Sequence, residues 1–228
     1  MIDVDLAGQL LDYGARIDSP DRAREQLHGA VAIHNLLARH RVAYLADEVG
    51  MGKTLVALGA VALFRHFDPR FRVLVISPRE NIQRKWQKEL RTFAAHNVRF
   101  ADLRTRGLGG APARPMVHAE NLMSLLRETA LDAERDFFVR LPSFSLQLGK
   151  EEVHWDRLRD ELRRHIPWLP KEALDLRGHH QRKDNVARAL CCALPEFDLV
   201  IVDEAHNLKH GFQDDVAARN RVLGLALG

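Results

Sequence analysis

Long apolar runs are missing from this sequence. No stretch approaches the roughly 18 consecutive apolar residues that a membrane-spanning helix needs, and the first residues lack the basic-then-apolar order of a secretory signal. Cysteine is scarce as well, because the chain has only the adjacent pair Cys191 and Cys192, which cannot staple distant parts of a fold. These absences argue against a membrane or secreted protein and predict a cytoplasmic one.

The excess of positive over negative charge is also small, since the formal net charge is only +3. The positive charge is unevenly placed, however. Between residues 79 and 114, nine Lys or Arg stand against three acidic residues. This stretch is either a solvated helix face or a surface that contacts an anionic polymer. The apolar content of 46% is ample for the buried core of one large domain.

Five short apolar runs rich in Val, Ile and Leu predict strands, and helical patterns separate most of them. The runs cover residues 42–46, 73–76, 98–101, 116–119 and 199–202. Such runs are typical of strands buried on both faces. Their alternation with helices predicts an α/β fold with a doubly wound, mostly parallel sheet and helices on both faces.

Helix signals complete the outline. Ser19 and Pro20 predict a capped helix start. From residue 80 to residue 93 one apolar stripe runs through Ile82, Trp86, Leu90 and Phe93, with basic residues mostly off the stripe. Trp86 is therefore predicted to be a core residue. Residues 122–196 carry at least two helical patterns and predict a helical insertion within a single lobe that spans residues 1–228.

The strongest local motif is the segment ADEVGMGKT, residues 46–54, which lies between an apolar strand and a helical run. Gly50 and Gly52 let the backbone curl tightly and direct its N–H groups at phosphate oxygens near a helix N-terminus. Lys53 is expected to contact the β and γ phosphates, and Thr54 to offer its hydroxyl to Mg²⁺. The segment therefore predicts a phosphate-binding loop.

A second motif, DLVIVDEAHNLK, covers residues 198–209 and ends an apolar strand at two consecutive carboxylates. Ligands of doubly wound sheets bind at the carboxyl ends of the strands. Asp203 can hold Mg²⁺, and Glu204 can orient and deprotonate the water that attacks the γ-phosphate. An exposed pair of acids at a strand end with no catalytic role would give the same sequence pattern. Together with the phosphate loop, the pair predicts a nucleoside triphosphatase.

These two motifs resemble the first and second motifs of Swi/Snf-type ATPases of helicase superfamily two, which have an N-terminal RecA-like lobe with a DEAH box. The family's phosphate loop carries acidic residues before its glycines, so Asp47 at the place of the first glycine fits the likeness. The resemblance implies a glutamine that reads adenine, here Gln26. It implies ATP contacts from the following set: Gln26, Asp47, Glu48, Gly50, Met51, Gly52, Lys53, Thr54 and His206.

The segment VLVISPRENIQRKWQKEL, residues 73–90, resembles the family's turn that touches the nucleic-acid backbone. The resemblance places Ser77 and Arg79 on phosphates. It further implies ATP and Mg²⁺ as cofactors, double-stranded DNA as the track, and a second RecA-like lobe that supplies arginine fingers. Downstream motifs are missing, so we expect an N-terminal fragment that binds ATP but turns it over slowly on its own.

The resemblance implies translocation on DNA and remodelling of bound proteins, within larger complexes in some relatives. Such relatives act in transcription, repair, chromatin remodelling and bacterial defence against phage. Two alternatives stay open. One is a strand-separating helicase of the same superfamily. The other is an ATP-binding switch or scaffold without productive hydrolysis, against which the intact Lys53, Asp203 and Glu204 argue.

Overall fold

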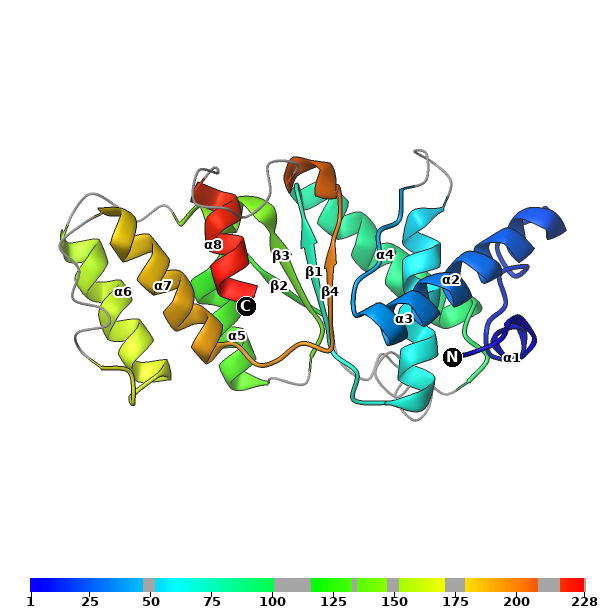
Figure 1. Cartoon of the computed structure of the whole chain (residues 1–228), viewed down its shortest axis with the longest axis horizontal. Coiled ribbons are helices and arrows are strands. Elements are labelled where there is room, and N and C mark those ends of the chain that lie inside the picture. Colours follow the sequence, from blue (N-terminus) through cyan, green and yellow to red (C-terminus); the bar gives the residue numbers. More distant parts are fainter. Residues whose placement is uncertain are drawn as a thin grey trace. The chain divides into compact units, whose positions relative to one another are not determined.

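The computed structural model describes residues 1–46, 52–100, 116–132, 135–146, 152–170, 179–208 and 218–227. The chain divides into two compact units (Figure 1). The first comprises Met1–Phe71 and Arg84–Pro115, and the second comprises Arg72–Gln83 and Met116–Gly228. Within the described ranges, no helix is long and apolar enough to cross a membrane.

Helices make up most of the first unit: α1 (Val4–Leu10), α2 (Pro20–His40), α3 (Lys53–Phe67) and the greater part of α4 (Glu80–His96). The predicted start of α2 is confirmed. The Ser19 side chain accepts a hydrogen bond from the Arg22 N–H at 3.4 Å, and Pro20 occupies the first turn. These local signals fix where α2 begins, 33 residues before Lys53 opens α3.

A close crossing joins α2 to α3. A Cβ atom built at Gly29 of α2 would lie 3.1 Å from a methyl group of Val56 in α3, which is tighter than ordinary van der Waals contact. Val56 itself is buried. The missing side chain at Gly29 therefore lets the two backbones approach each other, and α2 becomes the platform on which α3 rests.

The apolar stripe of α4 is confirmed. Trp86, Leu90 and Phe93 are buried, and the basic side chains between them are exposed. With the indole of Trp86 only 4% exposed, its interpretation as a core residue holds. The exposed basic residues are Arg84, Lys85, Lys88 and Arg91.

Two of the predicted strands are wrong in this structure. Residues 42–46 form no ladder, and Val42 and Tyr44 are largely exposed. Residue 98 makes only an isolated antiparallel bridge with Leu11, and residue 101 lies outside the described residues. An apolar run becomes a strand only when a neighbouring strand pairs with it, and the sequence does not reveal that pairing.

Four parallel strands form the sheet that the described part of the second unit contains, in the order β2-β3-β1-β4. They are β1 (Val73–Ser77), β2 (Val117–Ala119), β3 (Phe137–Arg140) and β4 (Leu199–Val202). Three of them were predicted, and β3 was not. All five residues of β1 are buried, as expected for an inner strand of a parallel sheet. The parallel α/β prediction is confirmed.

Carboxylates at the amino ends of the strands hold the sheet in register. The Val73 N–H donates to Oδ1 of Asp136, which precedes β3, at 3.1 Å. The Arg72 N–H donates to Oδ2 of Asp198, which precedes β4, at 2.6 Å. Each carboxylate therefore satisfies a donor at the start of β1 and connects that start to a neighbouring strand.

Helices of the second unit lie together on one side of the sheet (Figure 1). They are α5 (Leu122–Leu131), α6 (Glu152–His165), α7 (His179–Ala193) and α8 (Ala218–Leu227), with short 3₁₀ turns at Leu141–Ser145 and Ala205–Leu208. Their apolar faces and the sheet share one buried cluster, which includes Phe137 of β3 and Leu162 of α6. The unit therefore has one continuous core.

The segment 122–196 is more than the helical insertion that the sequence predicts. Helices α5, α6 and α7 are present, but the segment also contributes β3 to the interior of the sheet. Side chains at Leu162 and Ile166 on the predicted helical face are buried in the common core. This part of the chain therefore belongs to the framework of the second unit.

Candidate functional site

The phosphate-loop candidate is described from its last glycine onward. Gly52 has φ 82° and caps α3, a left-handed conformation that glycine adopts without strain. The Val56 N–H donates to the Gly52 carbonyl at 3.1 Å and closes the first helical turn. Asp47, Glu48, Gly50 and Met51, also expected to bind ATP, lie outside the described residues.

Lys53 and Thr54 form the first turn of α3, and both are half-buried. The N-cap residue is Gly52, which has no side chain to cap the helix, and the first turn has no acidic residue. A helix N-terminus carries partial positive charge and directs N–H groups outward, so it favours an anion. The start of α3 is therefore compatible with the phosphate contacts expected of Lys53, and these contacts stay a prediction.

Gln26 of α2 lies directly against this turn. A Cβ atom built at Gly52 would lie 2.6 Å from Oε1 of Gln26 and 3.0 Å from its Nε2. The amide of Gln26 and the backbone of Gly52 are therefore in close contact, and the two residues that the resemblance assigns to ATP lie side by side. That Gln26 reads adenine stays a prediction.

The acidic motif follows β4 in the second unit. Asp203 directly follows β4, and its N–H donates to the Ile76 carbonyl of β1 at 2.9 Å, which holds this residue against the sheet. Its carboxylate Oδ1 accepts the Glu204 N–H at 2.9 Å. Glu204 has φ 55°, an unusual conformation for a residue with a side chain, and its carboxyl lies 3.1 Å from Nδ1 of His206. Glu204 and His206 are both exposed.

Ser77 ends β1 and Arg79 lies in the turn after it, at the same edge of the sheet as Asp203, because the carboxyl ends of parallel strands meet there. The two side chains differ in environment. Ser77 is fully buried, and its hydroxyl lies 3.5 Å from the Arg79 carbonyl. Arg79 is exposed. Ser77 therefore shapes the turn, and Arg79 is the residue that faces solvent.

Sequence reasoning missed one basic residue at this edge. Arg140 ends β3 and is the register partner of Ser77. Its Nη2 lies 3.4 Å from the Glu120 carbonyl, which also accepts a 3.1 Å hydrogen bond from the Ser143 hydroxyl. Arg140 went unnoticed because β3 was not predicted, so nothing in the sequence placed its C-terminal end beside Ser77.

The structure thus assembles two groups of predicted residues, one in each unit. Gln26, Gly52, Lys53 and Thr54 come together in the first unit. The second unit brings together Ser77, Arg79, Asp203, Glu204 and His206 at one sheet edge. That these groups form one ATP site stays a prediction.

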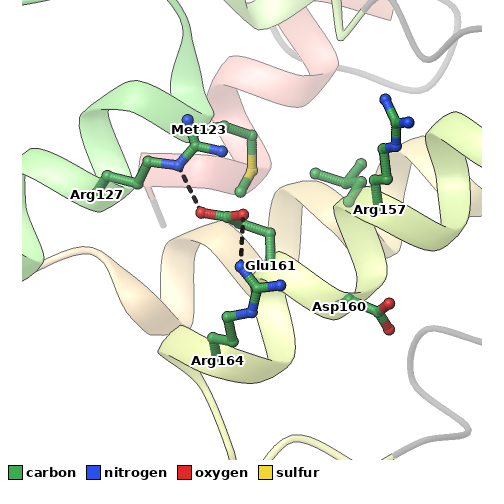
Figure 2. Close-up of a pocket in the computed structure, with 7 residues that line it drawn as sticks. Met123, Arg127, Arg157, Asp160, Glu161 and Arg164 are labelled. Atoms are coloured by element: carbon green, nitrogen blue, oxygen red, sulfur yellow. Dashed lines mark hydrogen bonds and ion pairs between the residues drawn. The ribbon is translucent and has the colours of Figure 1, made fainter.

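A cavity of about 370 Å³ in the second unit is lined by residues of α5 and α6, and none of the predicted site residues lines it (Figure 2). Its centre is Glu161, which pairs with Arg127 at 2.5 Å and with Arg164 at 3.5 Å. The hydrogen bond from Arg127 holds the pKa of the Glu161 carboxyl below its usual range. Because Glu161 already pairs with two of the arginines, the cavity is a less suitable anion site than the start of α3.

The four-stranded parallel sheet and its helices are those of an α/β protein of the RecA-like kind. Residues 21–121 match the family model described as type III restriction enzyme, res subunit. The domain that this model describes is an N-terminal lobe of superfamily-two helicases, and the matched range includes Gln26, α3 and β1. The match covers less than half of the chain. No curated protein and no solved structure matches the chain significantly.

Proposed function

We propose that this chain is the ATP-binding lobe of a DNA-dependent ATPase of the Swi/Snf-like group. The observation that carries the proposal is the start of α3, where Gly52 in the left-handed conformation leads into Lys53 and Thr54 beside Gln26. The family match over residues 21–121 supports it independently. In this proposal the lobe works in the cytoplasm with a second RecA-like lobe and moves along double-stranded DNA.

Each polar residue of the proposed ATP site has a task that suits its chemistry. Lys53 and the first N–H groups of α3 bind the β and γ phosphates. Thr54 and Asp203 offer hydroxyl and carboxylate oxygens, the hard ligands that Mg²⁺ prefers, so the donor set fits this ion. Magnesium, when bound, would offset the phosphate charge. Gln26 reads adenine.

Glu204 is the proposed base of hydrolysis. Its carboxylate accepts the proton of the attacking water, and the water oxygen attacks the γ-phosphorus as the bond to the β-phosphate oxygen breaks. His206, 3.1 Å from this carboxyl, orients it. An exposed carboxyl at the end of β4 can reach a water without any change in the sheet.

We assign a contact with the DNA backbone to Arg79. It is exposed after β1, and the exposed basic residues of α4 follow it along the chain. A guanidinium binds phosphate oxygens through two parallel donors and reads no sequence. Arg79→Glu should therefore weaken binding to DNA of any sequence. It should also lower the slope of log affinity against log salt by about 0.9 for each DNA phosphate that the protein no longer neutralises.

The proposal is tested by separating ATP binding from ATP hydrolysis. Lys53→Ala should abolish or strongly weaken ATP binding in calorimetry. Glu204→Gln should bind ATP as the parent does and hydrolyse it on the order of 10²–10⁴ times more slowly, measured in the full-length protein with DNA. Glu196→Gln is the matched control, because Glu196 is exposed in the segment before β4. Parental hydrolysis by Glu204→Gln would remove Glu204 as the base.

A further inference from the structure

The N-terminal segment of the first unit is bound to the residues that follow α4. The Asp12 N–H donates to the Asn97 carbonyl at 2.7 Å, and Nδ2 of Asn97 donates back to the Asp12 carbonyl at 2.6 Å. Arg99 adds an ion pair with the Asp12 carboxylate at 2.8 Å. These contacts fix the backbone of Asp12 and hence the position of the next residue, Tyr13.

Tyr13 reaches from this segment to the first turn of α3. It is only 3% exposed, and its hydroxyl donates to the Leu55 carbonyl at 2.9 Å. Leu55 directly follows Lys53 and Thr54. The Tyr13 ring also packs edge-on against Phe93 of α4, with 5.7 Å between the ring centroids. One side chain therefore links α4 to the turn that carries the phosphate-binding residues.

Gly59 of α3 makes room for the Tyr13 hydroxyl. A Cβ atom built at Gly59 would lie 2.0 Å from that hydroxyl oxygen and 2.8 Å from Cβ of Ala30 in α2. Glycine in the middle of a helix is less favourable than alanine. A phenylalanine at position 13 would fill the same space without the hydroxyl. Gly59 is therefore a residue that is unfavourable inside a helix, and it stands at the point of α3 that the Tyr13 hydroxyl approaches.

We propose that Tyr13 is a positioning residue for phosphate binding. It holds the first turn of α3 on a brace, which consists of residues 10–13 and 97–99. Lys53 and Thr54 then meet the nucleotide from an ordered backbone and lose less conformational freedom on binding. This inference rests on the proposed ATP-binding function. The family match begins at residue 21, so the first half of the brace lies outside the matched range.

Tyr13→Phe tests the hydroxyl alone, since the ring that packs against Phe93 is kept. The chain's other tyrosine supplies the matched control, because Tyr44 is 73% exposed. The affinity for a non-hydrolysable ATP analogue with Mg²⁺ is measured by calorimetry on folded protein. Tyr13→Phe should bind the analogue about two- to tenfold more weakly, the effect of one hydrogen bond. Tyr44→Phe should bind it as the parent does.

Backbone hydrogen exchange without nucleotide tests the brace by itself. Amides of residues 56–59 should exchange faster in Tyr13→Phe than in the parent, and amides of α5 in the second unit should be unchanged. Equal exchange at residues 56–59 would overturn the brace. Faster exchange with unchanged affinity would overturn the positioning role. If Lys53→Ala binds the analogue as the parent does, the proposed ATP-binding function is wrong. The hydrogen-exchange result at residues 56–59 then still tests whether the brace exists.

Discussion

Gly52→Ala is the substitution whose cost follows most directly from the structure. Gly52 has φ 82°, where a residue with a Cβ atom loses roughly 1–2 kcal/mol. The new methyl group would also lie 2.6 Å from Oε1 of Gln26. That atom is the far end of a flexible side chain, so Gln26 can rotate away, and the backbone term is the larger of the two. We expect the free energy of unfolding to fall by about 1–2 kcal/mol.

Urea unfolding followed by circular dichroism measures this loss. Gly8→Ala is the matched control, since Gly8 lies inside α1 and its Cβ would make only an ordinary 3.6 Å contact with Leu27 of α2. It should leave stability unchanged or raise it by up to about 1 kcal/mol. A cycle with Gln26→Ala separates the two causes at Gly52. The coupling should stay within about 0.5 kcal/mol, and a double variant that regains the parent's stability would refute the backbone argument.

Two further predictions concern α4 and the brace. Trp86→Ala should lower the free energy of unfolding by about 3–5 kcal/mol, because the indole is buried; unchanged stability with weakened DNA binding would make Trp86 a stacking residue instead. The hydrogen bond from Arg99 holds the pKa of the Asp12 carboxyl below its usual range. The stability that this hydrogen bond gives the folded protein is complete above the pKa of about 4 that the carboxyl has in the unfolded chain. It disappears as the pH falls through the lower pKa of the folded protein. The difference in urea midpoint between the parent and Arg99→Ala should therefore shrink as the pH falls below about 4, and a difference that grows as the pH falls would contradict this.

Features of the fold that depend on local chemistry could be predicted from the sequence. The start of α2 at Ser19 and Pro20 depends on one cap, and the stripe of α4 depends on helical spacing. The runs that became β1, β2 and β4 are apolar enough to stand out. At the candidate site, the glycine-lysine-threonine order placed Lys53 at the start of α3 for the same reason.

Features that depend on distant partners could not be predicted. Strand β3 has only four residues and a run too short to distinguish from a helix, and it becomes a strand because it pairs with both β1 and β2. Arg140 and its position beside Ser77 follow from that pairing. The hydrogen bond from Tyr13 to Leu55 spans 42 residues of sequence, and no local pattern indicates it.

The conformation of Glu204 connects the fold to the chemistry that we propose. A residue with a side chain at φ 55° costs roughly 1–2 kcal/mol relative to an ordinary conformation. Burial does not offset this cost, since the Glu204 side chain is 47% exposed. The conformation is fixed from both sides instead, by the Asp203 N–H on the Ile76 carbonyl and the Glu204 N–H on the Asp203 carboxylate. Strain that contributes nothing to packing is typical of a functional residue. The backbone conformation of Glu204 therefore supports its proposed role as the base independently of its motif.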